Sequence, residues 1–307
     1  MLFFTETVIS GLMAGVMYAL VALGFVLIFK ASGIFNFAQG VLALFAALAL
    51  YDFMSPDGWA AALIGFPLPV PFAILATIGV MIALAWLIER LVLRHLVNQE
   101  GIILFMATIG LAYVLEGLGD ILFGSDVKAL DIGIPQGAHD YLFDQYGLYI
   151  EKLEMFAAAT AAVLVTVLAL FFQKTRTGRA LRAVADDHQA ALSVGISLRT
   201  IWVIVWSVAG IVALVAGIMW GSKSGVQFSL SLIALKALPV LILGGFTSVP
   251  GAIVGGLIIG VGEKVAEVYV GPYVGGAIEN WFAYMLALVF LLFRPQGLFG
   301  EKIIERV

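Results

Sequence analysis

Apolar residues fall in long runs that short polar segments separate along most of the chain. The runs lack the alternation of apolar and polar positions that is typical of membrane-barrel strands. Most of them approach the roughly 20 residues that a helix needs to cross about 30 Å of hydrocarbon. Backbone groups must pair within a segment where water is absent, so each span should be a helix. We expect an all-α polytopic integral membrane protein with about eight transmembrane helices plus broken or re-entrant half-helices, drawn from residues 7–29, 37–51, 67–88, 101–123, 154–172, 201–221, 229–245, 250–262 and 280–293.

Three of these runs, at 37–51, 229–245 and 250–262, are short for a complete span. Glycines seven residues apart frame a polar, helix-breaking stretch at 33–40 and again at 244–251. Paired interruptions in the two halves of a transporter indicate an inverted repeat and a substrate path near the midplane. We therefore divide a single membrane domain, 1–307, into a first repeat at roughly 7–172, a cytoplasmic loop at 173–200, a second repeat at roughly 201–293 and a cytoplasmic tail at 294–307.

The composition is typical of a protein embedded in a lipid bilayer, because 63% of the 307 residues are hydrophobic, only 12% are charged, and the mean hydropathy is +1.10. A soluble domain typically has about 25% charged residues. Cysteine is absent, which excludes disulfides, thiolate metal sites and a cysteine nucleophile. The N-terminal stretch has no basic region and carries Glu6, so we expect a retained first helix and no cleaved signal.

Basic residues predict the orientation, since they concentrate on the cytoplasmic side of membrane proteins. They cluster after the 67–88 run, through the 173–200 loop and in the 294–307 tail, which we place in the cytoplasm. The acidic loop at 124–153 is then outside, and so is the N-terminus. The loop at 173–200 and the tail are both placed in the cytoplasm, so the chain must cross the membrane an even number of times between them. The runs at 201–221 and 280–293 provide two crossings. The pair at 229–262 must therefore enter and leave by one face, or cross as one broken unit.

Catalytic chemistry finds little support in the sequence. The three histidines lie far apart in loops, and there is no zinc-protease or serine-hydrolase motif. The stretch from Gly217 to Ser224 resembles a phosphate-binding loop, but Ser222 replaces a required glycine and a membrane span precedes it. We expect no enzyme activity, no metal site and no nucleotide site in this chain.

Charged residues within apolar runs are candidates for function. Glu116 and Asp120 lie four apart on one predicted helix, near its outer end, and could line a vestibule or simply sit at the interface. Lys236 and Lys264 are expected to extend toward the interface, with Glu263 beside the second of them.

The loop at 173–200 predicts one or two short cytoplasmic helices. Asp186 or Asp187 can cap a helix N-terminus, and Gly195 occupies the position just after a helix end. Such a loop either only fixes the topology or docks a soluble partner.

Several motifs resemble those of the branched-chain amino acid ABC permeases. These are GIFNFAQG at 33–40, TRTGRALRAVADDHQAALSVGIS at 175–197, LILGGFTSVPGAIVGGLIIGVGE at 241–263 and LLFRPQGLFG at 291–300. The similarity runs along nearly the whole chain. Its length resembles the LivH-type subunit more than the longer LivM-type subunit.

The resemblance implies two groups of functional residues. The first is a coupling helix that docks on an ATPase subunit, formed by Asp186, Asp187, His188, Gln189, Ala190, Ala191 and Gly195. The second is a translocation path beside Asn36, Phe37, Gln39, Gly40, Gly244, Gly245, Ser248, Gly251 and Gly255. Family members often carry histidine where this chain has Gln39, so the ligand at that position is open. Glycines four apart along 251–260 also predict close helix packing by themselves.

The function implied is the permease subunit of a binding-protein-dependent ABC importer in the bacterial inner membrane. The implied partners are a LivM-type permease, two ABC ATPases that bind ATP and magnesium, a periplasmic solute-binding protein and membrane lipid, with no nucleic acid. Branched-chain or related hydrophobic amino acids are the family's substrates. Urea, short amides and aromatic acids are alternatives within the family, and a stand-alone secondary transporter is the alternative of another class.

Overall fold

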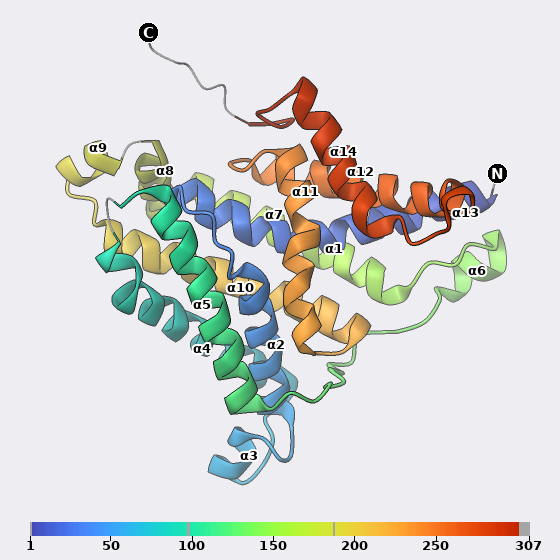
Figure 1. Ribbon diagram of the computed structural model, residues 1–307. Helices are drawn as coiled ribbons and strands as arrows, with labels where there is room; N and C mark the ends of the chain where they lie inside the picture. Colours follow the sequence, from blue (N-terminus) through green and yellow to red (C-terminus); the bar gives the residue numbers. More distant parts are fainter. Residues whose placement is uncertain (1, 97–98, 187, 301–307) are drawn as a thin grey trace. The chain divides into compact units, whose positions relative to one another are not determined.

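The computed structural model describes residues 2–96, 99–186 and 188–300, and these form helices joined by short connections (Figure 1). The described helices are α1 (Leu2–Ser32), α2 (Gln39–Met54), α3 (Trp59–Ile64), α4 (Val70–Leu91), η1 (Leu93–His95), α5 (Gly101–Phe123), α6 (Asp140–Tyr146), α7 (Lys152–Lys174), α8 (Arg176–Asp186), α9 (His188–Ser193), α10 (Leu198–Ser224), η2 (Phe228–Leu232), α11 (Ile233–Gly244), α12 (Val249–Tyr269), α13 (Gly271–Val274) and α14 (Glu279–Phe293).

Within the described residues, seven helical segments are long and apolar enough to cross a membrane, and two apolar segments, Phe228–Gly244 and Trp281–Phe293, are shorter. The chain is therefore a multi-pass membrane protein, as predicted. Each predicted apolar run corresponds to a helix, but the predicted end at residue 262 is wrong. Helix α12 continues to Tyr269 through Glu263, Lys264 and Glu267, because these side chains find partners within the protein.

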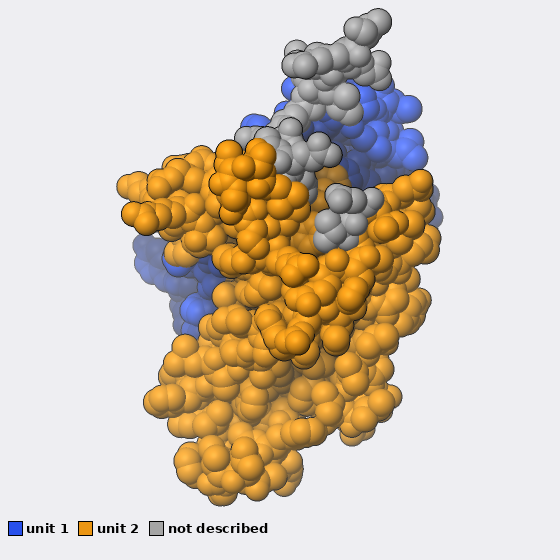
Figure 2. Space-filling view, turned by 90° about the vertical axis from the view of Figure 1, so that its left-hand side faces the viewer, with its two compact units in different colours: residues 1–26, 133–165, 233–307 blue, residues 27–132, 166–232 orange. Residues whose placement is uncertain are grey.

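The described chain divides into two compact units, coloured separately in Figure 2. Unit 1 comprises residues 1–26, 133–165 and 233–307, and unit 2 comprises 27–132 and 166–232. In unit 1, α11, α12 and α14 pack against one another. In unit 2, α10 packs on α2 and α4, and α2 also packs on α5. The proposed inverted repeat stays a prediction.

Helices α11 and α12 form an antiparallel hairpin in unit 1. Gly244 meets Gly251, and Gly255 meets Val240, on the two sides of the turn. With 12 residues, α11 spans only about 18 Å, less than the roughly 30 Å of hydrocarbon. Helix α12, with 21 residues, is long enough to cross it, so both alternatives for the pair, entry and exit by one face or one broken crossing, stay predictions.

The C-terminal segment closes the turn end of this hairpin. The backbone N–H of Leu298 donates to the Leu243 carbonyl at 2.8 Å, and that of Phe299 donates to the Gly244 carbonyl at 3.1 Å. The last carbonyls of a helix have no partner within the helix, so the tail satisfies them for α11. The tail motif and the second glycine-rich motif thus form one structural element.

Candidate functional site

The first glycine-rich motif forms a buried polar turn before α2 in unit 2. Asn36 and Gln39 are both 0% exposed. The Asn36 Oδ1 accepts from the Ala38 N–H at 3.1 Å, and its Nδ2 donates to the Gln39 Oε1 at 3.4 Å. The Gln39 Nε2 in turn donates to the Ala209 carbonyl of α10 at 3.5 Å. The neutral amide of Gln39 therefore serves as acceptor and donor at once, and joins the turn to α10.

The same turn is joined to α5 through Thr108. The Phe37 N–H donates to the Thr108 Oγ1 at 3.1 Å, and the one proton of that hydroxyl can be donated either to the Phe105 carbonyl at 2.9 Å or to the Phe35 carbonyl at 3.1 Å. Phe35 contacts the Phe105 ring in a tilted arrangement and Phe37 contacts it edge to face, with ring centroids 5.9 and 6.1 Å away. Gly40 is buried in the first turn of α2. The turn that carries the first group of predicted path residues therefore has polar contacts to both α5 and α10.

The second glycine-rich motif shapes the hairpin of unit 1. Ser248 caps α12, since its Oγ accepts from the Gly251 N–H at 3.0 Å. Gly245 has a φ of +102°, and a side chain there would also meet the backbone of Gly300. A Cβ on Gly255 would lie 3.2 Å from the Gly244 Cα. The glycines of this motif therefore let two backbones touch, and their role beside a path stays a prediction.

Replacing Gly255 by leucine is expected to separate α11 from α12, because the new side chain would overlap the backbone of α11. We expect lower thermal stability in detergent together with loss of uptake. Gly262→Ala on the same helix is the matched control, since its Cβ would meet only the ends of the Leu286 and Phe282 side chains. Wild-type stability and uptake in Gly255→Leu would contradict the close approach of the two helices.

The opposite side of α12 packs on α1, again through glycine. A Cβ on Gly11 would lie 2.7 Å from the Val261 Cα, and one on Gly256 would lie 2.6 Å from the Gly15 carbonyl oxygen. Gly260 lies against the backbone of Gly11 and Gly15. The predicted small-residue face of 251–260 is confirmed as a packing surface, with α11 on one side and α1 on the other.

An ion-pair cluster, defined by Tyr18, Lys236, Glu263, Lys264 and Glu279, lies within unit 1. The Lys236 Nζ is 3.1 Å from the Glu263 Oε1 and 3.5 Å from the Glu279 Oε1. The Tyr18 hydroxyl donates to the same Glu263 oxygen at 3.1 Å, and the Lys264 Nζ lies 3.3 Å from the Glu279 Oε2. The Glu263 side chain is only 2% exposed. A charge buried in this way needs a partner, and Lys236 supplies it.

This cluster was not predicted from the sequence. Lys236 and Lys264 are predicted to extend toward the interface, whereas both form ion pairs with carboxylates of the protein. The available signal was Glu263 inside an apolar run. The partner could not be read from the sequence, because Lys236 lies 27 positions earlier, on another helix.

Two further polar contacts hold the cluster's helices together. Pro239 lies inside α11 and has no N–H for the Leu235 carbonyl one turn earlier. The Tyr284 hydroxyl of α14 donates to that carbonyl at 2.6 Å. The Glu267 carboxylate accepts from the backbone N–H of Ile278 at 2.8 Å and of Glu279 at 2.9 Å, at the start of α14. Such acceptors stabilise helix N-termini.

The predicted cytoplasmic helices are present as α8 and α9 in unit 2. Asp187 and the side chains of Asp186, His188, Gln189 and Ala190 lie outside the described residues. Gly195 has a φ of +86°; its N–H donates to the Leu192 carbonyl, and the Ile196 N–H donates to the Ala191 carbonyl, both at 3.0 Å. This pair of bonds is the Schellman ending, so the predicted position of Gly195 after a helix end is confirmed.

The exposed face of α9 differs from the predicted one. The sequence suggests that Ala191 enters a partner's groove, but Ala191 is only 2% exposed in this chain. Leu192 and Val194 are 50% and 74% exposed instead. Among the described side chains from Ala191 onward, Leu192 and Val194 therefore carry apolar surface that a partner could contact.

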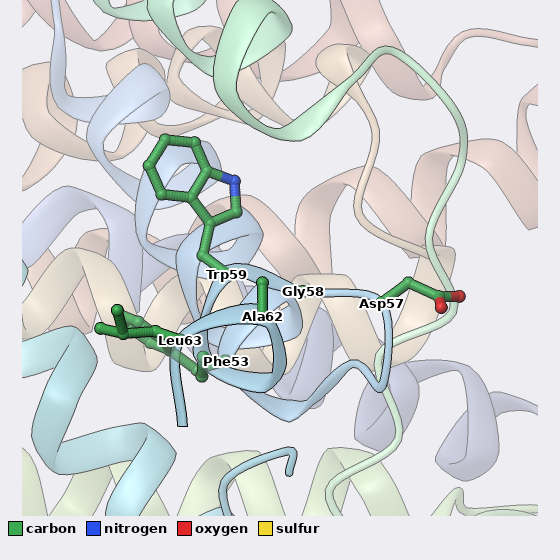
Figure 3. A pocket seen from close by; sticks show the side chains of 7 residues that line it. Phe53, Asp57, Gly58, Trp59, Ala62 and Leu63 are labelled. Carbon is green, nitrogen blue, oxygen red and sulfur yellow. The ribbon is translucent and has the colours of Figure 1, made fainter. Parts of the chain in front are cut away.

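Two cavities flank the helix ends of unit 2. Glu116 and Asp120 line an open one of about 290 Å³ with Gly117, Ser125 and Phe228, and its role as an outer vestibule stays a prediction. The other measures about 670 Å³ and lies against α3, where Trp59 and Leu63 form part of the wall (Figure 3). Asp57 is the one ionisable residue in that wall, so an amino acid's two charged groups would find only one counter-charge there.

Comparison with known proteins identifies relatives over the full chain. A family model described as branched-chain amino acid transport system, permease component, matches residues 7–294. The high-affinity branched-chain amino acid transport system permease protein BraD of Pseudomonas aeruginosa is 29% identical, with 99% of this chain and 98% of that protein covered. The corresponding LivH protein of Escherichia coli K12 is 28% identical, with 100% and 98% covered.

An archaeal relative is also similar. The probable branched-chain amino acid transport permease protein LivH of Methanocaldococcus jannaschii is 27% identical over 92% of this chain and 88% of that protein. The match from residue 7 to 294 includes both glycine-rich motifs, the ion-pair cluster and helices α8 and α9.

Proposed function

Since this chain belongs to the family of branched-chain amino acid transport system permease components, we propose that it is the membrane-spanning subunit of a binding-protein-dependent ABC importer. In this role it moves branched-chain or related hydrophobic amino acids into the cytoplasm. The observation that carries the proposal is the family match over residues 7–294, which begins within α1 and includes the other apolar helices that the structure describes.

The proposed importer contains several other subunits. A homologous LivM-type permease forms the second half of the pathway, and two ABC ATPases bind ATP and magnesium in the cytoplasm. A solute-binding protein in the periplasm delivers and largely selects the substrate. This chain contributes no ATPase activity of its own, and it lies in the bacterial inner membrane.

Helix α8 is suited to transmit motion between an ATPase and the membrane helices. The Thr175 Oγ1 accepts from the Gly178 N–H at 2.9 Å and lies 2.6 Å from the Phe171 carbonyl, to which it can donate. A side chain on Gly178 would overlap the backbone of Phe171 and Phe172. The corner between α7 and α8 is therefore tight, so a displacement of α8–α9 by a docked ATPase acts directly on the end of α7.

The function is tested by uptake into vesicles that contain the full set of subunits. We expect leucine uptake that requires ATP, the ATPases and the binding protein, and that unlabelled isoleucine or valine inhibits. Uptake of leucine by this chain alone would instead support a secondary carrier. Inhibition by urea or an aromatic acid, with none by isoleucine or valine, would assign another substrate of the same family.

A further inference from the structure

Helix α5 packs one face into unit 2 and leaves the opposite face uncovered. Its buried residues lie on the side of α2, where a Cβ on Gly119 would meet side chains of that helix. On the other side, Gly110, Tyr113, Gly117 and Asp120 follow one another at spacings of three and four residues, and all four are exposed. We call these four residues the α5 seam.

The α5 seam lies at the depth of the hydrocarbon. Helix α5 has 23 residues and is about 34 Å long, enough to cross the roughly 30 Å of hydrocarbon. Counted from the helix end at Phe123, Tyr113 lies about 15 Å along the helix and Glu116, beside the seam, about 10 Å. Among the described residues, no cation forms an ion pair with Glu116 or Asp120. Carboxylates at this depth face protein or water and not lipid.

Helix α4 of the same unit shows a surface that is suited to lipid. It has 22 residues, and its large exposed side chains are apolar, namely Phe72, Leu75, Ile82, Trp86 and Leu87. The carboxylate of this helix, Glu89, is only 2% exposed. Helix α5 differs because its seam combines two exposed glycines with an aspartate and with Tyr113, which is 69% exposed. The two helices therefore face different surroundings.

The chemistry of the α5 seam selects among the partners that could cover it. Exposed glycines let the backbone of another membrane helix approach closely. A water-soluble protein cannot reach Tyr113 within the hydrocarbon. A second copy of this chain, related by a twofold axis along the membrane normal, would present the same residues at the same depth, so carboxylates would oppose carboxylates. A different membrane subunit with a cation at that depth has neither disadvantage.

We propose that the α5 seam is the contact surface for a transmembrane helix of the second permease subunit, and that this helix carries a lysine or arginine at the depth of Glu116 and Asp120. The inference rests on the proposed function, which supplies that subunit. The open cavity of about 290 Å³ beside the seam gives such a side chain room between the two carboxylates and the Ser125 hydroxyl. Phe228 lines the same cavity and can contact the cation through its ring.

The first test replaces an exposed glycine in the complete importer, which is purified in mild detergent through a tag on this chain. A Cβ on Gly117 or on Gly79 of α4 meets no atom within 4 Å, so leucine at either position should leave the thermal stability of the isolated chain close to wild type. Gly117→Leu should lower the amount of second permease that copurifies by about tenfold or more, because the new side chain holds the helices apart. Gly79→Leu is the matched control and should retain it. Equal retention in the two variants would overturn the inference.

The second test concerns the cation of the partner helix. Glu116→Gln should weaken retention of the second permease, and Glu116→Lys should weaken it further, because the introduced lysine would face a like charge. Equal retention in Glu116→Gln and Glu116→Lys would show that the partner carries no cation at this depth, and would overturn that part of the inference.

The third test identifies the partner directly. The photo-crosslinking residue p-benzoylphenylalanine is placed at Tyr113, and as a control at Leu75 of α4, which is 63% exposed. We expect an adduct with the second permease from Tyr113 and adducts with lipid alone from Leu75. At Tyr113, an adduct with a second copy of this chain, with the binding protein or with lipid alone would overturn the inference. Uptake of leucine by the same vesicles separates the two proposals. ATP-dependent uptake with only lipid adducts at Tyr113 would overturn the seam and leave the importer, whereas a permease adduct without such uptake would support the seam and count against the importer.

Discussion

Replacing Lys236 by methionine is expected to lower the free energy of unfolding by about 3–5 kcal/mol, the usual loss when one partner of a buried ion pair is removed. The Glu263 carboxylate is 2% exposed and would keep the Tyr18 hydroxyl and the Glu279 carboxyl as close partners, but no cation. Within unit 1, α11, α12 and α1 all contribute to this cluster, so the loss should also loosen the hairpin.

The measurement is thermal unfolding of the purified chain in detergent, completed as a double-mutant cycle. Adding Glu263→Gln to Lys236→Met should restore most of the stability, because the amide no longer carries a buried charge and can still accept from Tyr18. Lys264→Met is the matched control. Its ion pair with Glu279 is 32% and 30% exposed, so the effect should be below about 1 kcal/mol. Equal losses of unfolding free energy in Lys236→Met and Lys264→Met would show that the burial of Glu263 does not determine how much each ion pair contributes to stability.

The helices could be predicted because membrane burial leaves a strong mark on sequence. Each helix of 2–54 and 198–224 matches an apolar run, since hydrocarbon excludes charges over the length of a span. Gly195 could be assigned because a left-handed helix ending favours glycine. The small-residue face of α12 followed from glycine spacing alone. These signals are local, and each depends on one helix.

The features that the sequence did not reveal depend on contacts between distant segments. The length of α12 was underestimated because Glu263 and Lys264 read as an interface, whereas Lys236 and Glu279 neutralise them inside the protein. Ala191 reads as a surface residue of a cytoplasmic loop, yet neighbouring helices bury it. A small side chain such as that of Ala191 fits both a groove of a partner protein and the packed interior of this chain. The residue type alone therefore could not distinguish docking from burial.

The burial of Ala191 changes how coupling to an ATPase should be tested. An arginine at this position would need to be accommodated within the fold of unit 2, so loss of activity could reflect misfolding. Leu192 is 50% exposed on α9, so an arginine there can extend into solvent more readily than at Ala191. If α9 enters a groove of the ATPase, Leu192 is the apolar side chain of that helix available to fill it.

Leu192→Arg is therefore expected to uncouple the importer. Removing a central apolar contact of about 2 kcal/mol should reduce leucine uptake by roughly 30-fold, while thermal stability of the isolated chain stays close to wild type. ATP hydrolysis should lose its stimulation by the loaded binding protein, or the ATPase should dissociate. Both activities are measured in the same reconstituted vesicles.

The matched control for uncoupling is Gln173→Arg, which places the same charge on an exposed position of the same loop outside α9. Surface substitutions away from a contact usually change stability by less than about 0.5 kcal/mol, so this variant should keep wild-type uptake. Wild-type uptake and stimulated hydrolysis in Leu192→Arg would mean that α9 is not the coupling element. Equal losses in both variants would point to the charge of the loop as a whole, since Gln173 lies in α7 and Leu192 in α9.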